Sequence, residues 1–290
     1  MENSDTRLDF SQFTTINVSI ENQVAHLQLC RPGQLNSMIP EFWRELPEVV
    51  RKIDYHSAAR VIVISTLGKH FSAGMDLSVF TQMAKDFSGE PARRAEKLRR
   101  SVLELQDSFN ALEEIRIPVL IAAQGGVIGG AVDMICAADC RYCTQDAFFT
   151  IKETEIGMTA DVGTLQRLPH LIPQGLVREL AYTGRNWSAA EALAQGFVNQ
   201  VYEDQQTMLT AVMQIAQKIA ANSPMAVAGC KEMINYSRDH NVDDSLKYMA
   251  TWQSGMFQMP DIQEAMAAQQ QKRAPLYAQL LDKTSMMSKK

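Results

Sequence analysis

Three acidic residues, Asp133, Glu153 and Asp161, stand out because their surroundings in the sequence are apolar or rich in glycine. Asp133 follows the small and apolar residues 127–132, and Glu153 and Asp161 lie on either side of Gly157. An unpaired carboxylate in such surroundings is costly, so each group needs a hydrogen-bond partner, a counter-charge or a bound proton. Three of them close together in the sequence predict a site that moves protons near neutral pH.

Two glycine-containing turns supply a second chemical possibility. They span residues 68–77 and 125–130, and each follows an expected strand. Backbone N–H groups at such strand-to-helix turns lack partners, so two turns that face each other would form an oxyanion hole from main-chain donors. Neither turn matches a Walker A or a dinucleotide fingerprint. Each one, taken alone, fits an ordinary connection between a strand and a helix better than a binding site.

Strands and helices that must position these residues alternate over the first two thirds of the chain. β-Branched or alternating apolar residues predict strands at 15–20, 24–29, 60–65, 118–123 and 139–143, with the first two as a hairpin. Helical spacing predicts helices at 40–53, 92–114 and 129–137. This alternation is typical of an α/β fold with layered sheets.

From residue 204 onward, only helices are expected. Apolar residues share one face over 209–219, a second helix follows Pro224, and a third runs from Val242 toward Met259, ahead of Pro260. These apolar faces exceed what a separate three-helix unit would bury, which favours docking on the main domain or on a neighbouring subunit. We therefore divide the chain into a core of residues 1–203 with the active site and a helical oligomerisation region of residues 204–290.

The composition excludes several classes of protein. Of the 290 residues 46% are hydrophobic, yet no apolar stretch reaches the roughly 20 residues of a membrane span. A net charge of −5 without a long basic run argues against nucleic acid as the main partner. Cys140 and Cys143 have no second Cys or His pair at zinc-ligand spacing, so we expect buried thiols and no metal site.

The ends of the chain and its cysteines lead us to expect a cytoplasmic protein. Residues 1–10 are mostly polar and acidic, unlike a signal or transit peptide. The last three residues, 288–290, fall short of the Ser-Lys-Leu peroxisomal address. An odd number of cysteines, five, fits a reducing compartment.

Longer motifs carry a resemblance to a known family. Over about residues 12–260 the chain resembles the crotonase (enoyl-CoA hydratase/isomerase) superfamily, through CRPGQLN at 30–36, FSAGMDL at 71–77 and GGVIGG at 125–130. Within it the chain is most similar to the Δ3,5-Δ2,4-dienoyl-CoA isomerases, through AFF at 147–149, KE at 152–153, ADVGTLQRLP at 160–169 and YSRDH at 236–240. The resemblance implies a crotonase-type spiral of ββα units, with a helical C-terminal region that forms trimers, commonly paired into hexamers.

The resemblance also implies an acyl-CoA thioester as the substrate, with coenzyme A as part of that substrate and no separate cofactor. It places the two N–H donors for the thioester oxygen at Met75, where Ile or Ala is usual, and at Gly130. The family's contacts with the adenine and pantetheine groups carry over to Ala73, Gly74, Met75, Asp76 and Leu77, with Arg31 as a further candidate.

The three acids fall where the isomerase subfamily has its acidic active-site residues. Hydratases of the family have Glu at position 133 and typically Gly at position 161. Moving two conjugated double bonds from 3,5 to 2,4, a step of fatty-acid β-oxidation, removes a proton at C2 and delivers one at C6. Because one short side chain cannot serve both carbons, a base and an acid are needed. We predict Glu153 and Asp161 as this pair, and Asp133 as the residue that tunes their pKa values.

Other readings of the sequence remain open. A hydratase would use Asp133 and Glu153 to hold a water molecule, which leaves Asp161 without a role. A dehalogenase, a hydrolase or a 1,3-isomerase of the same fold does not explain the segment around Asp161 either. The chain would fit a non-catalytic acyl-CoA-binding paralogue only if its acids served no chemistry.

Overall fold

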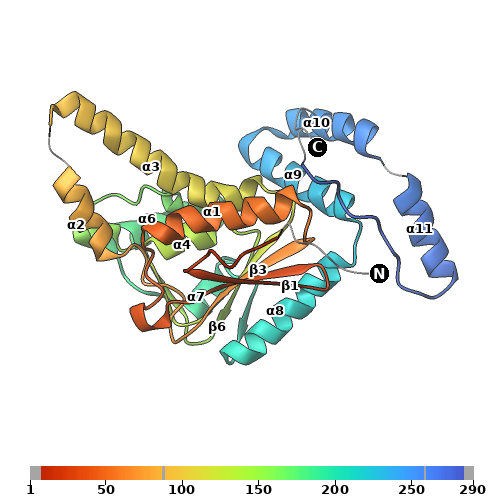
Figure 1. Cartoon of the computed structure of the whole chain (residues 1–290), viewed down its shortest axis with the longest axis horizontal. Coiled ribbons are helices and arrows are strands. Elements are labelled where there is room, and N and C mark those ends of the chain that lie inside the picture. The colour runs from red at the N-terminus through yellow and green to blue at the C-terminus, as the bar shows by residue number, and fades with distance from the viewer. Residues whose placement is uncertain (1–7, 87–88, 258, 284–290) are drawn as a thin grey trace.

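A six-stranded sheet lies at the centre of the computed structural model, which describes residues 8–86, 89–257 and 259–283 (Figure 1). In spatial order its strands are β1 (Ile16–Glu21), β2 (Val24–Leu29), β3 (Val61–Thr66), β4 (Val119–Ala123), β6 (Cys140–Thr144) and β9 (Gln200–Tyr202). Neighbouring strands are parallel except β1 and β2, which form the predicted antiparallel hairpin. The α/β architecture expected from the sequence is confirmed.

The helices cover both faces of this sheet, and the alternation of side chains in β3 explains why. Ile62 and Ile64 point into the main core together with α1 (Pro40–Tyr55) and α3 (Pro91–Glu114), whereas Val61 and Val63 point toward α8 (Gln205–Ala220). Successive strand residues face opposite sides, so a run of six buried residues requires cover on both faces. In Figure 1, α8 lies below the sheet, and α1 and α3 lie above it.

A second, three-stranded sheet is formed by β5 (Gly126–Ile128), β7 (Phe148–Thr150) and β8 (Trp187–Ser188). The sequence predicts a turn at residues 125–130, but β5 pairs in parallel with β7, so residues 126–128 form a strand. β5 also binds the first glycine turn, because the Ser72 N–H donates to Gly126 O and the Ile128 N–H donates to Ser72 O. This pairing holds the two turns against each other.

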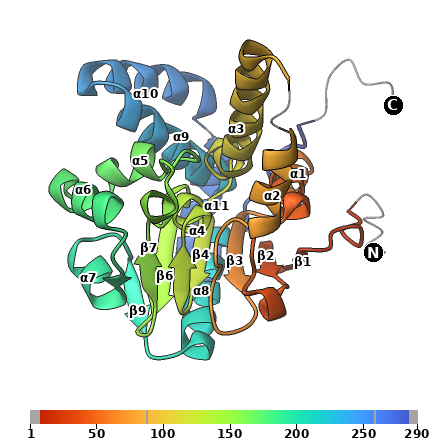
Figure 2. The ribbon, with the colours of Figure 1, turned by 90° about the vertical axis from the view of Figure 1, so that its left-hand side faces the viewer.

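The remaining helices are α2 (Leu77–Asp86), α4 (Gly130–Cys136), α5 (Thr164–Arg167), α6 (Gln174–Thr183), α7 (Ala189–Ala194), α9 (Pro224–Asp239), α10 (Val242–Met256) and α11 (Met259–Gln270). Helices α10 and α11 extend from one end of the molecule in Figure 1, and Figure 2 looks at the molecule from the opposite end. The predicted helices match within a few residues, but α5, α6, α7 and α11 are not predicted from the sequence. For α11 the reason is Pro260, which favours the end of a helix as well as its beginning. Pro260 lies in the first turn of α11, where the backbone N–H that proline lacks would have no partner within the helix.

The helical region after residue 204 is not separate from the core in its packing, because α8 shares a buried cluster with the central sheet. The division of the chain after residue 203 stays a prediction. In the described part of the chain, no helix combines the length and the apolar character that crossing a membrane would require.

Candidate active site

The three acidic residues come from separate segments, and the fold brings them together. Asp133 lies in the first turn of α4, Glu153 begins the 3-10 helix Glu153–Ile156, and Asp161 precedes α5. Asp133 and Glu153 are only 1% and 9% exposed, and Asp161 is half-buried. The charge of Asp161 acts on both other acids, and that of Asp133 acts on Glu153.

Asp133 is held by the first residue of α5. The Thr164 N–H donates a hydrogen bond to Asp133 Oδ1 at 2.6 Å, and the Thr164 hydroxyl also interacts with this carboxyl. Burial raises the pKa of Asp133 to about 6, against the lowering effect of these hydrogen bonds. A carboxyl with this pKa is poised between its two forms close to neutral pH.

Glu153 carries the least satisfied carboxyl of the three. Its Oε2 is buried and has no hydrogen-bond partner within the described chain. Burial, followed by the charge of Asp133, raises the pKa of Glu153 to about 7. Gly129, at φ +55°, makes room for it, since a Cβ there would lie 3.2 Å from Glu153 Oε1. This oxygen therefore keeps unused capacity to accept a hydrogen bond or to carry a proton.

Asp161 completes the group. Burial raises its pKa above the ordinary value, while its own backbone N–H lowers it. Its backbone carbonyl accepts a hydrogen bond from Gln106 Nε2 at 2.7 Å, which ties the segment to α3. Three neighbouring carboxyls with raised pKa values can hold both a proton donor and a proton acceptor at neutral pH.

The two predicted oxyanion donors, the N–H groups of Met75 and Gly130, also lie close together. A Cβ placed on Gly130 would be 3.8 Å from the Met75 nitrogen. Gly74, at φ +80°, permits this approach, because its Cβ would lie 2.5 Å from Ile128 O and 3.2 Å from the Gly130 nitrogen. Among the backbone hydrogen bonds of the described residues, neither N–H has an acceptor. Both are free to bind a developing negative charge.

The residues predicted to bind coenzyme A gather around Ser37. Asp76 accepts hydrogen bonds from the Ser37 and Ser78 side chains, and these hold its pKa low, at about 2. Arg31 Nη1 donates to Ser37 O at 3.3 Å, and Leu77 is 76% exposed. The Asp76 carboxylate thus has structural partners of its own, and contact of this group of residues with coenzyme A stays a prediction.

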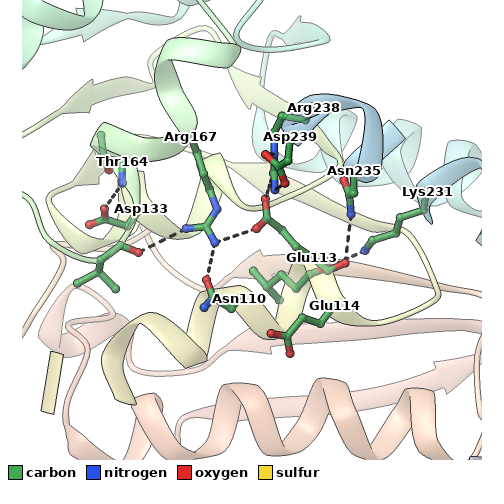
Figure 3. Close-up of polar contacts among 12 residues, drawn as sticks. Asn110, Glu113, Glu114, Asp133, Thr164, Arg167, Lys231, Asn235, Arg238 and Asp239 are labelled. Atoms are coloured by element: carbon green, nitrogen blue, oxygen red, sulfur yellow. Dashed lines mark hydrogen bonds and ion pairs between the residues drawn. The ribbon is translucent and has the colours of Figure 1, made fainter. Parts of the chain in front are cut away.

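Several polar residues around the site were not singled out from the sequence. Arg167 in α5 contacts Asn110 and Glu113 of α3, directly behind Asp133 and Thr164 (Figure 3). A signal existed, because Gln106, Asn110 and Glu113 are polar residues at i, i+4 and i+7 and share one helix face. It could not be distinguished from an ordinary solvated face without knowing what the helix packs against.

His70 has a structural role, and the five cysteines form no disulfide bond. His70 Nδ1 accepts a hydrogen bond from the Gly126 N–H at 2.8 Å, which links the two glycine turns. All five cysteines are free; Cys140 and Cys143 belong to β6. Across the ranges that the structure describes, no group of three or more His, Cys, Asp or Glu residues is arranged to hold a metal ion.

Comparison with known proteins finds the same family that the sequence motifs indicate. A sequence model of the enoyl-CoA hydratase/isomerase family matches residues 19–280. The mitochondrial Delta(3,5)-Delta(2,4)-dienoyl-CoA isomerase of Mus musculus is 46% identical over 88% of this chain and 79% of the relative. The peroxisomal enzyme of that name from Arabidopsis thaliana is 38% identical over 95% of this chain and all of the relative. The crystal structure of an enoyl-CoA hydratase from Bacillus anthracis superposes with a TM-score of 0.81 at 30% identity, over 91% of this chain and 99% of that one.

These relatives correct one prediction. The expected cytoplasmic location is wrong, because the similar isomerases are named mitochondrial or peroxisomal. The expectation depended largely on residues at the two ends of the chain, and residues 1–7 and 284–290 lie outside the described part. Address segments are short and are read by receptors, so the shared fold and its packing do not encode them.

Proposed function

The chain belongs to the enoyl-CoA hydratase/isomerase family, and we propose that it is an isomerase that converts 3,5-dienoyl-CoA thioesters into 2,4-dienoyl-CoA thioesters, a step of fatty-acid β-oxidation. One observation carries this proposal: Asp161 joins Asp133 and Glu153 in a single cluster of carboxyls with raised pKa values. The names of the similar isomerases agree with it. The chemistry requires no cofactor, since coenzyme A is part of the substrate.

In the proposed mechanism, the thioester oxygen lies between the N–H groups of Met75 and Gly130. One carboxylate of the pair Glu153 and Asp161 removes a proton from C2, and the electrons move into a conjugated trienolate that the two donors stabilise. The other member of the pair, protonated at the start, delivers its proton to C6. The double bonds then lie at 2,4, and the two carboxyls have exchanged their protonation states. Asp133 tunes both members through its charge.

We expect purified protein incubated with 3,5-octadienoyl-CoA in D₂O to produce the 2,4-dienoyl chromophore, with deuterium at C6 of the product. The proton for C6 comes from a carboxyl group that exchanges with solvent between turnovers, while the C2 proton leaves on a different carboxylate. Mass spectrometry and NMR of the product locate the label. Absence of the chromophore would refute the isomerase proposal, and extensive transfer of hydrogen from C2 to C6 would refute the two-carboxylate mechanism.

The likeness to a solved enoyl-CoA hydratase favours hydration as the second candidate function. In that reaction Asp133 and Glu153 would hold a water molecule for addition to a 2-enoyl-CoA. The half-buried Asp161 would then add a third negative charge that hydration does not use. Water addition to crotonyl-CoA, measured beside the isomerase assay, separates the two, and we expect isomerisation to dominate.

We further propose that the protein assembles into trimers or dimers of trimers through its helical end. In support, α10 has no buried residue. Large apolar side chains are exposed on or beside α10 and α11, namely Val242, Leu246, Met256, Phe257 and Met259. Exposed apolar surface of this kind marks interaction sites. Light scattering at micromolar concentration is expected to give the mass of a trimer or hexamer, and a monomer would contradict the proposal.

A further inference from the structure

A network of polar side chains lies beside Asp133 and Thr164 and links three segments that are distant in the sequence (Figure 3). Arg167 of α5 is at its centre. The Nη2 atom of Arg167 donates to Asn110 Oδ1 at 2.7 Å and to Glu113 Oε2 at 2.9 Å. Its Nη1 atom lies 3.5 Å from the carbonyl oxygen of Val162, in the segment that follows Asp161. The guanidinium therefore bridges helix α3 and the backbone that carries one of the three acids.

The backbone at Gly163 is adapted to this arrangement. Gly163 has φ +135°, and a Cβ there would lie 1.9 Å from Arg167 Nη1. Only a residue without a side chain lets the guanidinium cross this position. The Arg167 side chain is 11% exposed, so most of its charge is removed from water. Burying an arginine in this way requires compensating partners.

Glu113 is the compensating anion. Its Oε1 accepts a second hydrogen bond, at 2.6 Å, from Arg238 Nη1 of α9. Burial acts to raise the pKa of Glu113, but the Arg167 hydrogen bond and the charges of both arginines leave it below the ordinary value. Glu113 therefore stays ionised at neutral pH and fixes Arg167, while the nearby acids have raised pKa values.

We propose that Arg167, anchored by Glu113 and Asn110, is a positioning residue for the isomerisation: it holds the 161–164 segment in place and keeps a positive charge near Asp133. This inference rests on the proposed function. The geometry supports it because Arg167 contacts the carbonyl of Val162 and lies one helical turn after Thr164, whose N–H binds Asp133. The charge of Arg167 also lowers the pKa of Asp133, against burial and Asp161.

Four titratable or charged groups from the surrounding segments interact with Asp133. They are Cys136, Glu153, Asp161 and Arg167. Burial raises the pKa of Cys136 to about 12, so this thiol is neutral throughout the working range. Of the four, Arg167 carries a positive charge. Its removal should therefore move the titration of Asp133 upward in pH.

The test compares Arg167→Gln, Arg167→Lys and Glu113→Gln with the unchanged protein. In Arg167→Gln, we expect kcat to fall by about tenfold or more and KM to stay within a few fold. The part of the pH–rate profile that follows the titration of Asp133 should shift upward in pH. Arg167→Lys keeps the charge but cannot form the same fork of contacts, so it should restore the pH profile and only part of kcat. Glu113→Gln removes an anion, so its profile should not shift upward.

Arg185→Gln is the matched control, because Arg185 also pairs with two carboxylates, Glu179 and Glu191, away from the acid cluster. It should keep kcat and the pH profile of the unchanged protein. An Arg167→Gln profile that coincides with that of the unchanged protein would overturn the inference, as would equal losses in Arg167→Gln and Arg185→Gln.

A second readout does not depend on turnover. Protein labelled with ¹³C at the aspartate carboxyl carbon reports the titration of Asp133, with its signal assigned by its loss in Asp133→Asn. We expect this titration to move upward in Arg167→Gln and to return in Arg167→Lys. An unmoved Asp133 signal would refute the role of Arg167 even in a protein that isomerises the substrate. Failure of the unchanged protein to isomerise 3,5-octadienoyl-CoA would instead refute the proposed function and leave the NMR result to decide the inference.

Discussion

Glu153→Gln and Asp161→Asn should each lower the isomerisation of 3,5-octadienoyl-CoA by about 10²–10⁴-fold, the range for loss of a positioned acid or base. An amide of nearly the same shape neither accepts nor delivers the required proton. Acyl-CoA binding should change by only a few fold, because the Met75 and Gly130 donors and the loop around Ser37 are separate from these carboxyls. Steady-state kinetics combined with calorimetric binding of the product distinguish the two effects.

Glu155→Gln is the matched control for Glu153→Gln. Both residues belong to the same 3-10 helix, but Glu155 is exposed and pairs with Lys152. It should keep near-normal turnover. Thermal unfolding must accompany the kinetics, since Glu153→Gln can place an amide nitrogen where a buried oxygen has no partner, at a cost of about 1–3 kcal/mol of stability. Near-normal rates in both acid variants would refute the two-carboxylate mechanism.

Asp133→Asn is expected to be milder than either. The side-chain oxygen of the introduced amide can still accept the hydrogen bond from the Thr164 N–H, so the start of α5 keeps its anchor. What is lost is a negative charge that raises the pKa of Glu153. The effect is milder because Asp133 acts on the pKa values of Glu153 and Asp161 through its charge and does not itself transfer a proton.

The strands and helices up to residue 143 and after residue 204 were largely predicted because local patterns determine them, whereas no element between residues 144 and 203 was predicted. The alternation at 24–29 and the run at 60–65 each specify a strand, and these appear as β2 and β3 within a residue. Helix α11 was missed because proline both ends and begins helices, and only the tertiary structure decides which. Strand β5 was missed because its three residues are extended by pairing with β7, some twenty residues later.

The acidic residues of the site could be predicted from the sequence, but the side chains that hold them in place could not. A carboxyl within an apolar segment is visible in one dimension, so Asp133, Glu153 and Asp161 could be selected without a structure. The network of Glu113, Arg167 and Arg238 could not, because its members are 54 and 125 residues apart in sequence and are each typical of a solvated surface. Which helix faces meet is determined by packing and not by spacing.

Gly74→Ala should lower kcat by about 10²–10³-fold, the loss measured for an oxyanion-hole donor in other enzymes. The new methyl group would lie 2.5 Å from the backbone oxygen of Ile128, so the turn that carries the Met75 N–H must move away from Gly130. The carboxyls are not touched, and the pH–rate profile should therefore keep its shape while its height falls. Stopped-flow absorbance at the 2,4-dienoyl chromophore measures both.

Gly196→Ala is the control that separates the effect of backbone strain from the loss of the Met75 donor. Gly196 has φ +75°, close to the +80° of Gly74, but no atom lies within 4 Å of the position that its Cβ would take. Both variants should therefore lose about 1–2 kcal/mol of stability from an alanine in the left-handed region. Only Gly74→Ala should lose turnover. If Gly74→Ala kept its rate within a few fold, or if both variants lost it equally, the two backbone donors would not be the groups that stabilise the trienolate.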